Sequence, residues 1–168
     1  MPSSAAVADA GPLIHLDELD WLFVLETFTS VWVPPEVADE ASHYRPGWQE
    51  RAPTNIIIES ASPQAWGWWL SEASFVDLDK GEQAALALWH SHRDAILLCD
   101  DLQARIAAQN FRVPILGTLG LILRAAQHSL RPISEIRAIL NELPQRTSLH
   151  LKPALLQRVI DALPDDPD

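Results

Sequence analysis

The chain has 168 residues, enough for one domain that buries a sizeable core without a disulfide or a metal. Its 12 Lys and Arg residues stand against 23 Asp and Glu residues, and the formal net charge of −11 at pH 7 excludes a surface that holds nucleic acid by bulk charge. Cys99 is the single cysteine, which excludes an intramolecular disulfide. No apolar run approaches the ~20 residues of a membrane span and no secretory signature opens the chain, so we expect a soluble cytoplasmic protein.

Short apolar runs alternate with amphipathic segments, which predicts an α/β fold with a mainly parallel sheet flanked by helices. In the first half the predicted elements are a strand at 4–9, a helix at 11–28, a strand at 30–34, a helix at 34–44 and an edge strand at 55–60. Residues 63–73 form an aromatic-rich segment.

The same alternation continues in the second half. The predicted elements there are a helix at 80–92, a strand at 95–100, a helix at 101–111, a strand at 113–116 and helices at 117–129, 132–143 and 151–163. We predict a single domain over 1–163 and a disordered tail over 164–168. No basic residue precedes Arg45, so any local basic face belongs to later parts of the chain.

Acidic residues follow the predicted strands at their carboxyl ends. Asp9 ends the first strand, and Asp100 and Asp101 end the strand at 95–100. Glu40 lies one or two turns into the helix after the second strand, and Glu82 lies at the start of the helix at 80–92. In a parallel α/β sheet the ligand site lies outside the carboxyl ends of the strands, so four segments could bring carboxylates to one edge.

Gathered carboxylates repel one another, and a cation normally stabilises such a cluster. Ligation by oxygen alone favours Mg²⁺ or Mn²⁺ over zinc. A hard divalent ion in that position supports attack of water on phosphorus. The acids therefore predict hydrolysis of phosphodiesters.

Five blocks of the sequence resemble the successive blocks of PIN-domain proteins, particularly the branch of VapC-type toxin ribonucleases. They read VADAGPLIHL, VPPEVADEA, DKGEQAALALW, LLCDDLQARIAA and ILGTLGLILRAA, in the family's order. The resemblance implies a PIN-like three-layer sandwich and metal-dependent cleavage of RNA by an endoribonuclease. It also implies a toxin–antitoxin pair with a small antitoxin protein as partner, and a homodimer.

The resemblance also assigns the site. The metal ligands it implies are Asp9, Glu40, Glu82 and Asp100, and Asp101 matches a frequent second acid after the fourth block's strand. The family commonly has a hydroxyl or amide side chain within two residues of the first acid, whereas here Ala10 and Gly11 follow Asp9.

Each of these acids also has a purely structural interpretation. Asp9 could cap the following helix, and Glu82 could interact only with a helix dipole. Glu36 and Asp39 compete with Glu40 for the side of their helix that faces the site. These alternatives remain open at the level of the sequence.

For Asp101 the alternative is a helix cap combined with an ion pair to Arg105, which is spaced i, i+4. Arg105 could instead approach a phosphate. Thr118 is interpreted as a helix cap, with a role in lining the site as the alternative. The six histidines do not indicate a zinc site, and Cys99 is interpreted as a small buried hydrophobe.

The tryptophans of the aromatic-rich segment, with Trp48 nearby, are interpreted as a contact for a partner or a second copy; core packing and base stacking are the alternatives. A catalytically inactive PIN-like protein-binding module is accordingly the main rival function. A phosphatase of the haloacid-dehalogenase type requires a second Asp two residues after its nucleophile, and position 11 is Gly11.

Overall fold

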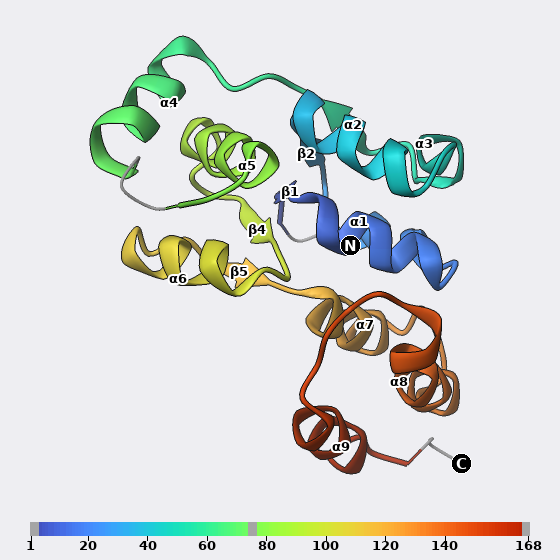
Figure 1. Ribbon diagram of the computed structural model, residues 1–168. Helices are drawn as coiled ribbons and strands as arrows, with labels where there is room; N and C mark the ends of the chain where they lie inside the picture. Colours follow the sequence, from blue (N-terminus) through green and yellow to red (C-terminus); the bar gives the residue numbers. More distant parts are fainter. Residues whose placement is uncertain (1–3, 74–76, 166–168) are drawn as a thin grey trace.

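The computed structural model describes residues 4–73 and 77–165 (Figure 1). In these residues five strands form one parallel sheet in the order β3-β2-β1-β4-β5. The strands are β1 (Ala6–Ala8), β2 (Val31–Val33), β3 (Ile56–Ile58), β4 (Ile96–Leu98) and β5 (Ile115–Leu116). Helices flank this sheet, which confirms the predicted α/β fold of PIN-like type, and the predicted edge strand is β3.

The central strands are apolar without alternation because both of their faces are covered. All three residues of β1 are fully buried, and Leu97 and Leu98 of β4 are almost as deep. Continuous apolar runs of this kind are typical of parallel strands between two layers of helices. The chain proceeds from β1 to β2 and β3 on one side and returns to β4 and β5 on the other, so the order of the strands reverses between β1 and β4.

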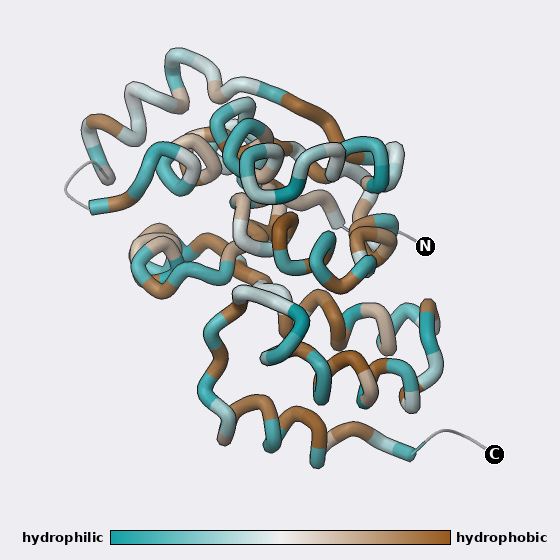
Figure 2. Tube along the Cα trace, turned by 45° about the vertical axis from the view of Figure 1, so that its right-hand side comes forward, coloured by the Kyte–Doolittle hydropathy of each residue, from teal (hydrophilic) through white to brown (hydrophobic). Residues whose placement is uncertain are grey.

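Nine α-helices and a π-helix of the described residues surround the sheet or extend from it. They are α1 (Ala10–Glu18), α2 (Pro35–Tyr44), α3 (Trp48–Arg51), α4 (Pro63–Trp68), α5 (Lys80–Ser91), α6 (Leu102–Asn110), α7 (Thr118–Gln127), α8 (Ile133–Arg146), α9 (Pro153–Asp161) and a π-helix, η2 (Trp69–Ala73). Brown and teal alternate along the helices in Figure 2, as expected where one face of a helix packs on the core and the other faces water.

The helix predicted over 11–28 is wrong in its second half. α1 ends at Glu18, and a 3-10 helix, η1 (Leu22–Thr27), follows it. Asp20 has a φ of 61°, and the N–H of Trp21 bonds the carbonyl of Leu16 at 2.8 Å. This left-handed residue and its 6→1 hydrogen bond form a Schellman motif, which ends a helix without a glycine or proline because Asp tolerates this conformation.

The interpretation of the tryptophans as a partner contact is wrong for Trp48 and Trp69, which are each 1% exposed and belong to the core. The indole N–H of Trp69 donates to Gln83 at 3.0 Å, and Trp66 and Trp68 are partly buried against the same core. Trp68 stacks on His90 with ring centroids 4.5 Å apart. Core packing therefore accounts for most of this aromatic surface.

At the carboxyl end α9 packs on α8, and α8 packs on α7 (Figure 1). Of the tail predicted over 164–168, residues 166–168 lie outside the described residues. In the residues that the structure describes, we find no helix with both the length and the apolar character needed to cross a membrane.

Candidate metal centre

Asp9 lies at the reversal point of the sheet, directly after β1. Its backbone N–H donates to the carbonyl of Leu98 in β4 at 2.9 Å, which fixes it beside the end of that strand. Asp9 occupies the cap position of α1, but its side chain makes no capping hydrogen bond. The carboxyl group is 6% exposed, and burial, together with the nearby carboxylates of Glu82, Asp79 and Glu40, raises its pKa to about 8. The helix-cap interpretation is therefore wrong for this side chain.

Glu40 and Glu82 approach Asp9 from two helices that pack together, α2 and α5. Glu40 is half-buried, whereas its competitors Glu36 and Asp39 are exposed. Burial, and then the charge of Asp79, raises the pKa of Glu40. A Cβ placed at Gly81 would lie 2.9 Å from a carboxylate oxygen of Glu40, so a side chain at this position would displace that carboxylate.

Glu82 has a structural role as well. Its carboxylate accepts from the backbone N–H of Asp79 at 3.0 Å, and Asp79 accepts from the N–H of Glu82 at 2.8 Å. This capping box starts α5. Burial, and the adjacent carboxylates of Asp79 and Asp101, raise the pKa of Glu82 to about 7 although its bond to the backbone of Asp79 opposes the shift.

Asp100 is held by two polar side chains that come from other elements. Thr118 donates to it twice, through its backbone N–H at 2.7 Å and its hydroxyl at 2.6 Å. Nδ1 of His15 lies 2.8 Å from the same carboxylate. Thr118 is the first residue of α7 and its hydroxyl is spent on Asp100, so its interpretation as a helix cap is wrong. A Cβ at Gly117 would lie 2.8 Å from Asp100.

Asp101 caps α6, because one of its carboxylate oxygens accepts from the N–H groups of Gln103 and Ala104 at 2.7 and 2.9 Å. Its predicted ion pair with Arg105 is absent from the described residues. Arg105 instead donates to the carbonyl of Cys99 at 3.2 Å. Cys99 itself is buried, as predicted, with its thiol 3.7 Å from Asp9.

The structure thus brings the predicted acids to one edge of the sheet. Asp9 interacts electrostatically with Glu40 and Glu82, and Glu82 interacts with Asp101. Asp100 follows β4, the neighbour of β1, but its carboxylate is turned toward Thr118 and His15. Among residues 4–73 and 77–165, no three His, Cys, Asp or Glu side chains converge closely enough to hold a metal ion.

A hard divalent cation fits the donor chemistry of these acids, which is all oxygen. In the structure the carboxylates of Glu82, Asp101 and Asp100 also accept hydrogen bonds from backbone N–H groups at the starts of α5, α6 and α7. Oδ1 of Asp101 and Oδ2 of Asp100 each already have two partners, whereas Oδ1 of Asp100 accepts one hydrogen bond and keeps a lone pair for further coordination.

A hollow of about 560 Å³ opens beside Asp79 and Glu40, between α2 and the start of α5. We call it the acidic hollow; it is lined by Glu36, Asp39, Glu40, His43, Tyr44, Asp79, Lys80 and Gly81. Four carboxylates against one lysine make its wall strongly negative, which suits a cation and repels a phosphate.

Asp79 and His15 were missed from the sequence, and a site role for Thr118 was only the alternative to a helix cap. Asp79 could have been found from the spacing of DKGE, because Asp followed three residues later by Glu is the pattern of a capping box. His15 and Thr118 carry no local signal. Their contacts with Asp100 join positions 85 and 18 residues apart in the chain, and they arise only when α1 and α7 pack beside β4.

The comparisons with known proteins place the chain in a family. A family model described as a PIN domain matches residues 5–164. No curated protein matches the chain significantly. PIN domains are generally nucleases and usually use divalent metals. With a family model that covers nearly the whole sequence and acids gathered at the carboxyl edge of its parallel sheet, this chain belongs to the PIN-domain family.

Proposed function

We propose that this protein is a divalent-metal-dependent endoribonuclease that uses Mg²⁺ or Mn²⁺. One observation carries the proposal: Asp9 lies buried at the reversal point of the sheet, and burial together with the charges of Glu82, Asp79 and Glu40 raises its pKa to about 8. Repelling carboxylates destabilise the fold when no cation is bound. In a PIN domain, a bound divalent metal explains why such a cluster is present.

The metal ligands in this proposal are Asp9, Glu40, Glu82 and Asp100. When bound, a hard divalent cation polarises the phosphoryl group and acidifies the water beside it. Asp9 supplies a carboxylate from the floor of the site, and Glu40 and Glu82 supply theirs from α2 and α5. Thr118 and His15 hold Asp100 in one orientation. Asp101 adds negative charge beside Glu82 and keeps α6 capped.

The finer assignment follows the resemblance to VapC-type ribonucleases. In that assignment the protein is the toxin of a toxin–antitoxin pair, acts on RNA as a homodimer and is restrained by a small antitoxin protein. A nuclease that cuts cellular RNA must be restrained, and an inhibitory partner is the simplest means. A small reading frame directly beside the gene is the expected sign of that partner.

Cleavage of RNA tests the proposal. The purified protein, free of any partner, is incubated with a mixed pool of fluorescent RNAs in Mn²⁺ and in EDTA, beside an Asp9→Asn/Asp100→Asn double variant. We expect cutting in Mn²⁺ alone, lost in the double variant while circular dichroism reports a retained fold. A folded wild-type protein that cuts nothing and binds no Mn²⁺ would instead support the inactive protein-binding module.

A further inference from the structure

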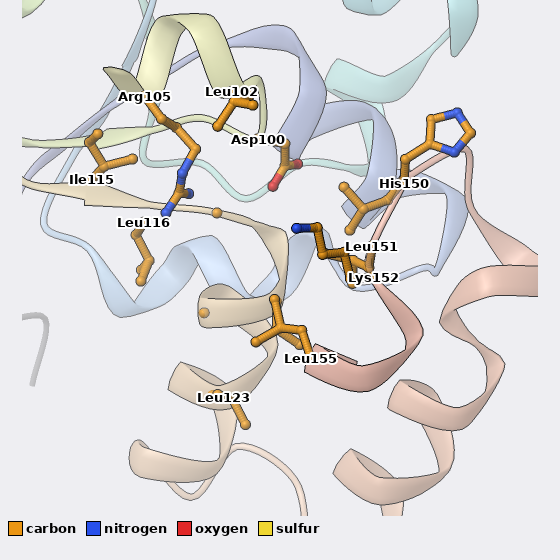
Figure 3. Close-up of a pocket in the computed structure, with 14 residues that line it drawn as sticks. Asp100, Leu102, Arg105, Ile115, Leu116, Leu123, His150, Leu151, Lys152 and Leu155 are labelled. Carbon is orange, nitrogen blue, oxygen red and sulfur yellow. The ribbon is translucent and has the colours of Figure 1, made fainter. Parts of the chain in front are cut away.

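A second cavity lies on the other side of Asp100, between α6, α7 and residues 149–155 (Figure 3). We call it the leucine cavity: leucines from α6, β5, α7 and residues 149–155 line most of its wall, and its polar side chains are Asp100, Arg105, His150 and Lys152. Its volume is about 580 Å³, within the range of roughly 300–1,000 Å³ that small-molecule sites occupy. Asp100 is the acid that lines it.

The cations of the leucine cavity are available for a ligand. Within the described ranges, 4–73 and 77–165, neither Arg105 nor Lys152 takes part in an ion pair. Arg105 uses one N–H on the carbonyl of Cys99, which fixes its guanidinium at the mouth of the site. Lys152 is exposed, and in Figure 3 its ammonium group points toward Asp100. Two cations thus lie beside an acid proposed to hold metal, in a chain whose net charge is −11.

We propose that the leucine cavity binds the nucleotide next to the scissile phosphate of a single-stranded substrate. In this assignment, which rests on the proposed function, Lys152 and Arg105 contact the phosphates and the leucines, among them Leu123 and Leu155, pack against the base. Cations that neutralise phosphates supply most of the affinity for a polynucleotide, and they are effective here although the whole chain is acidic.

The apolar wall sets the class of substrate. A base in a duplex is stacked on both faces and paired at its edge, so it cannot enter a cavity without being extruded. An unpaired base can pack one face against apolar side chains while its polar edge keeps its hydrogen bonds to water or to polar side chains, and its backbone follows the cations outside. The inference is therefore specific for single strands, and a blunt duplex should bind more weakly.

Binding of RNA in EDTA tests this without requiring cleavage. The probe is an eight-nucleotide fluorescein-labelled RNA followed by anisotropy. Lys152→Ala should raise Kd about 10-fold and reduce the slope of log affinity against log salt by about 0.7, the value for one phosphate contact on a single strand. Arg158→Ala is the matched control: it removes one exposed positive charge from α9 but does not line the cavity, and should change Kd less than about 2-fold.

The apolar wall is tested by filling it. Leu155, which is 39% exposed at the rim, is replaced by tryptophan, and Ile106→Trp serves as control because Ile106 is 45% exposed and lies outside the cavity. We expect weaker RNA binding for Leu155→Trp alone, and tighter binding of the single strand than of a blunt duplex of the same length. Calorimetry with Mn²⁺ should give the same affinity for Leu155→Trp and Ile106→Trp, because neither changes a charge.

Equal losses in Lys152→Ala and Arg158→Ala would overturn the inference, since only bulk charge would then act. If Leu155→Trp binds RNA with the same Kd as the wild type, the inference is also overturned. The cavity would then be a site for a protein partner. The two proposals fail separately. Metal-dependent cleavage whose KM does not respond to Lys152→Ala refutes the nucleotide site alone, whereas RNA binding through the cavity without any cleavage in Mn²⁺ refutes the nuclease alone.

Discussion

Two hollows of nearly equal size flank the acids, at about 560 and 580 Å³, and they differ in almost everything else. The acidic hollow has four carboxylates and one lysine in its wall, whereas the leucine cavity has one carboxylate, two permanent cations and many leucines. The volume of a hollow therefore does not indicate its ligand. The charge of its wall determines which ligand it attracts. A cation is attracted to the first wall and a phosphate to the second.

The two hollows place opposite charges at different parts of the site. Glu40 and Asp79 line the acidic hollow and Asp100 lines the leucine cavity, so in the proposed function the cation and the substrate phosphate would approach the acids through different hollows. An RNA-binding protein with a net charge of −11 needs such a separation, because an even distribution of that charge would repel its substrate. The following predictions either break this separation or sharpen it.

The largest expected effect is the loss of cleavage when Asp9 is replaced. Asp9→Asn should reduce Mn²⁺-dependent cleavage at least about 100-fold, because even partners of metal ligands cost about 10- to 100-fold when removed. Asp94→Asn is the matched control, since exposed Asp94 lies before the amino end of β4, at the opposite edge of the sheet. Single-turnover cleavage of one RNA measures both. Equal cleavage rates for the two variants would show that Asp9 is not needed for cleavage.

A tenfold effect is expected from the support of Asp100. Thr118→Val keeps the shape of a fully buried side chain but removes its 2.6 Å hydrogen bond to Asp100. Cleavage should fall about 10-fold, since the carboxylate loses part of its orientation. Thr147→Val removes a hydroxyl that donates to the carbonyl of Leu143 and accepts from the N–H of Leu149 but contacts no acid, and it should leave the rate unchanged. A fall of the same size in both would point to general destabilisation.

The two lysines compare the hollows directly. Lys80 lines the acidic hollow, Lys152 lines the leucine cavity, and both are exposed at the start of a helix. Each change to alanine removes the same charge, yet Lys152→Ala should weaken RNA binding about 5-fold more than Lys80→Ala, because only the former faces substrate phosphates. Anisotropy titrations in EDTA give the ratio. A ratio of one would show that the hollows do not differ toward RNA.

The smallest effect concerns stability without metal. In EDTA the pKa of Asp9 is about 8 instead of 3.8, so between these pH values the folded protein holds a proton that the unfolded chain has lost. The free energy of unfolding therefore falls as the pH rises from 4 toward 8. Asp9→Asn should remove this slope and raise Tm at pH 8 by roughly 3–6 °C.

Thermal unfolding of wild type, Asp9→Asn and Asp94→Asn across pH 4–8 checks that slope. Asp94→Asn should follow the wild-type curve, because its side chain is exposed. If the three curves of Tm against pH are parallel, burial of Asp9 does not lower the free energy of unfolding as its raised pKa implies.

The sequence predicts well those features that have a local signal. The strands were found because Val7, Leu97 and their neighbours form apolar runs, and Asp9 and Asp100 were found because each follows such a run. The break after α1 was missed because Asp20, which adopts the left-handed conformation there, is not the usual glycine.

What the sequence cannot predict depends on contacts between distant segments. Which of Glu36, Asp39 and Glu40 faces Asp9 depends on how α2 packs against α5. The attachment of Asp100 to His15 and Thr118 depends on three elements meeting at one strand end. An ion pair between Arg105 and Asp101 was an alternative that their spacing left open, but Asp101 caps α6 and Arg105, which lines the leucine cavity, donates to the carbonyl of Cys99.

Calorimetric titration of the partner-free protein with Mn²⁺ at pH 7 tests the central claim most directly, because the account depends on a cation site made by these acids. We predict a saturable heat of binding for the wild-type protein and for Asp94→Asn, and its loss in Asp9→Asn. Absence of Mn²⁺ binding to a folded wild-type protein, or undiminished binding to Asp9→Asn, would contradict the account.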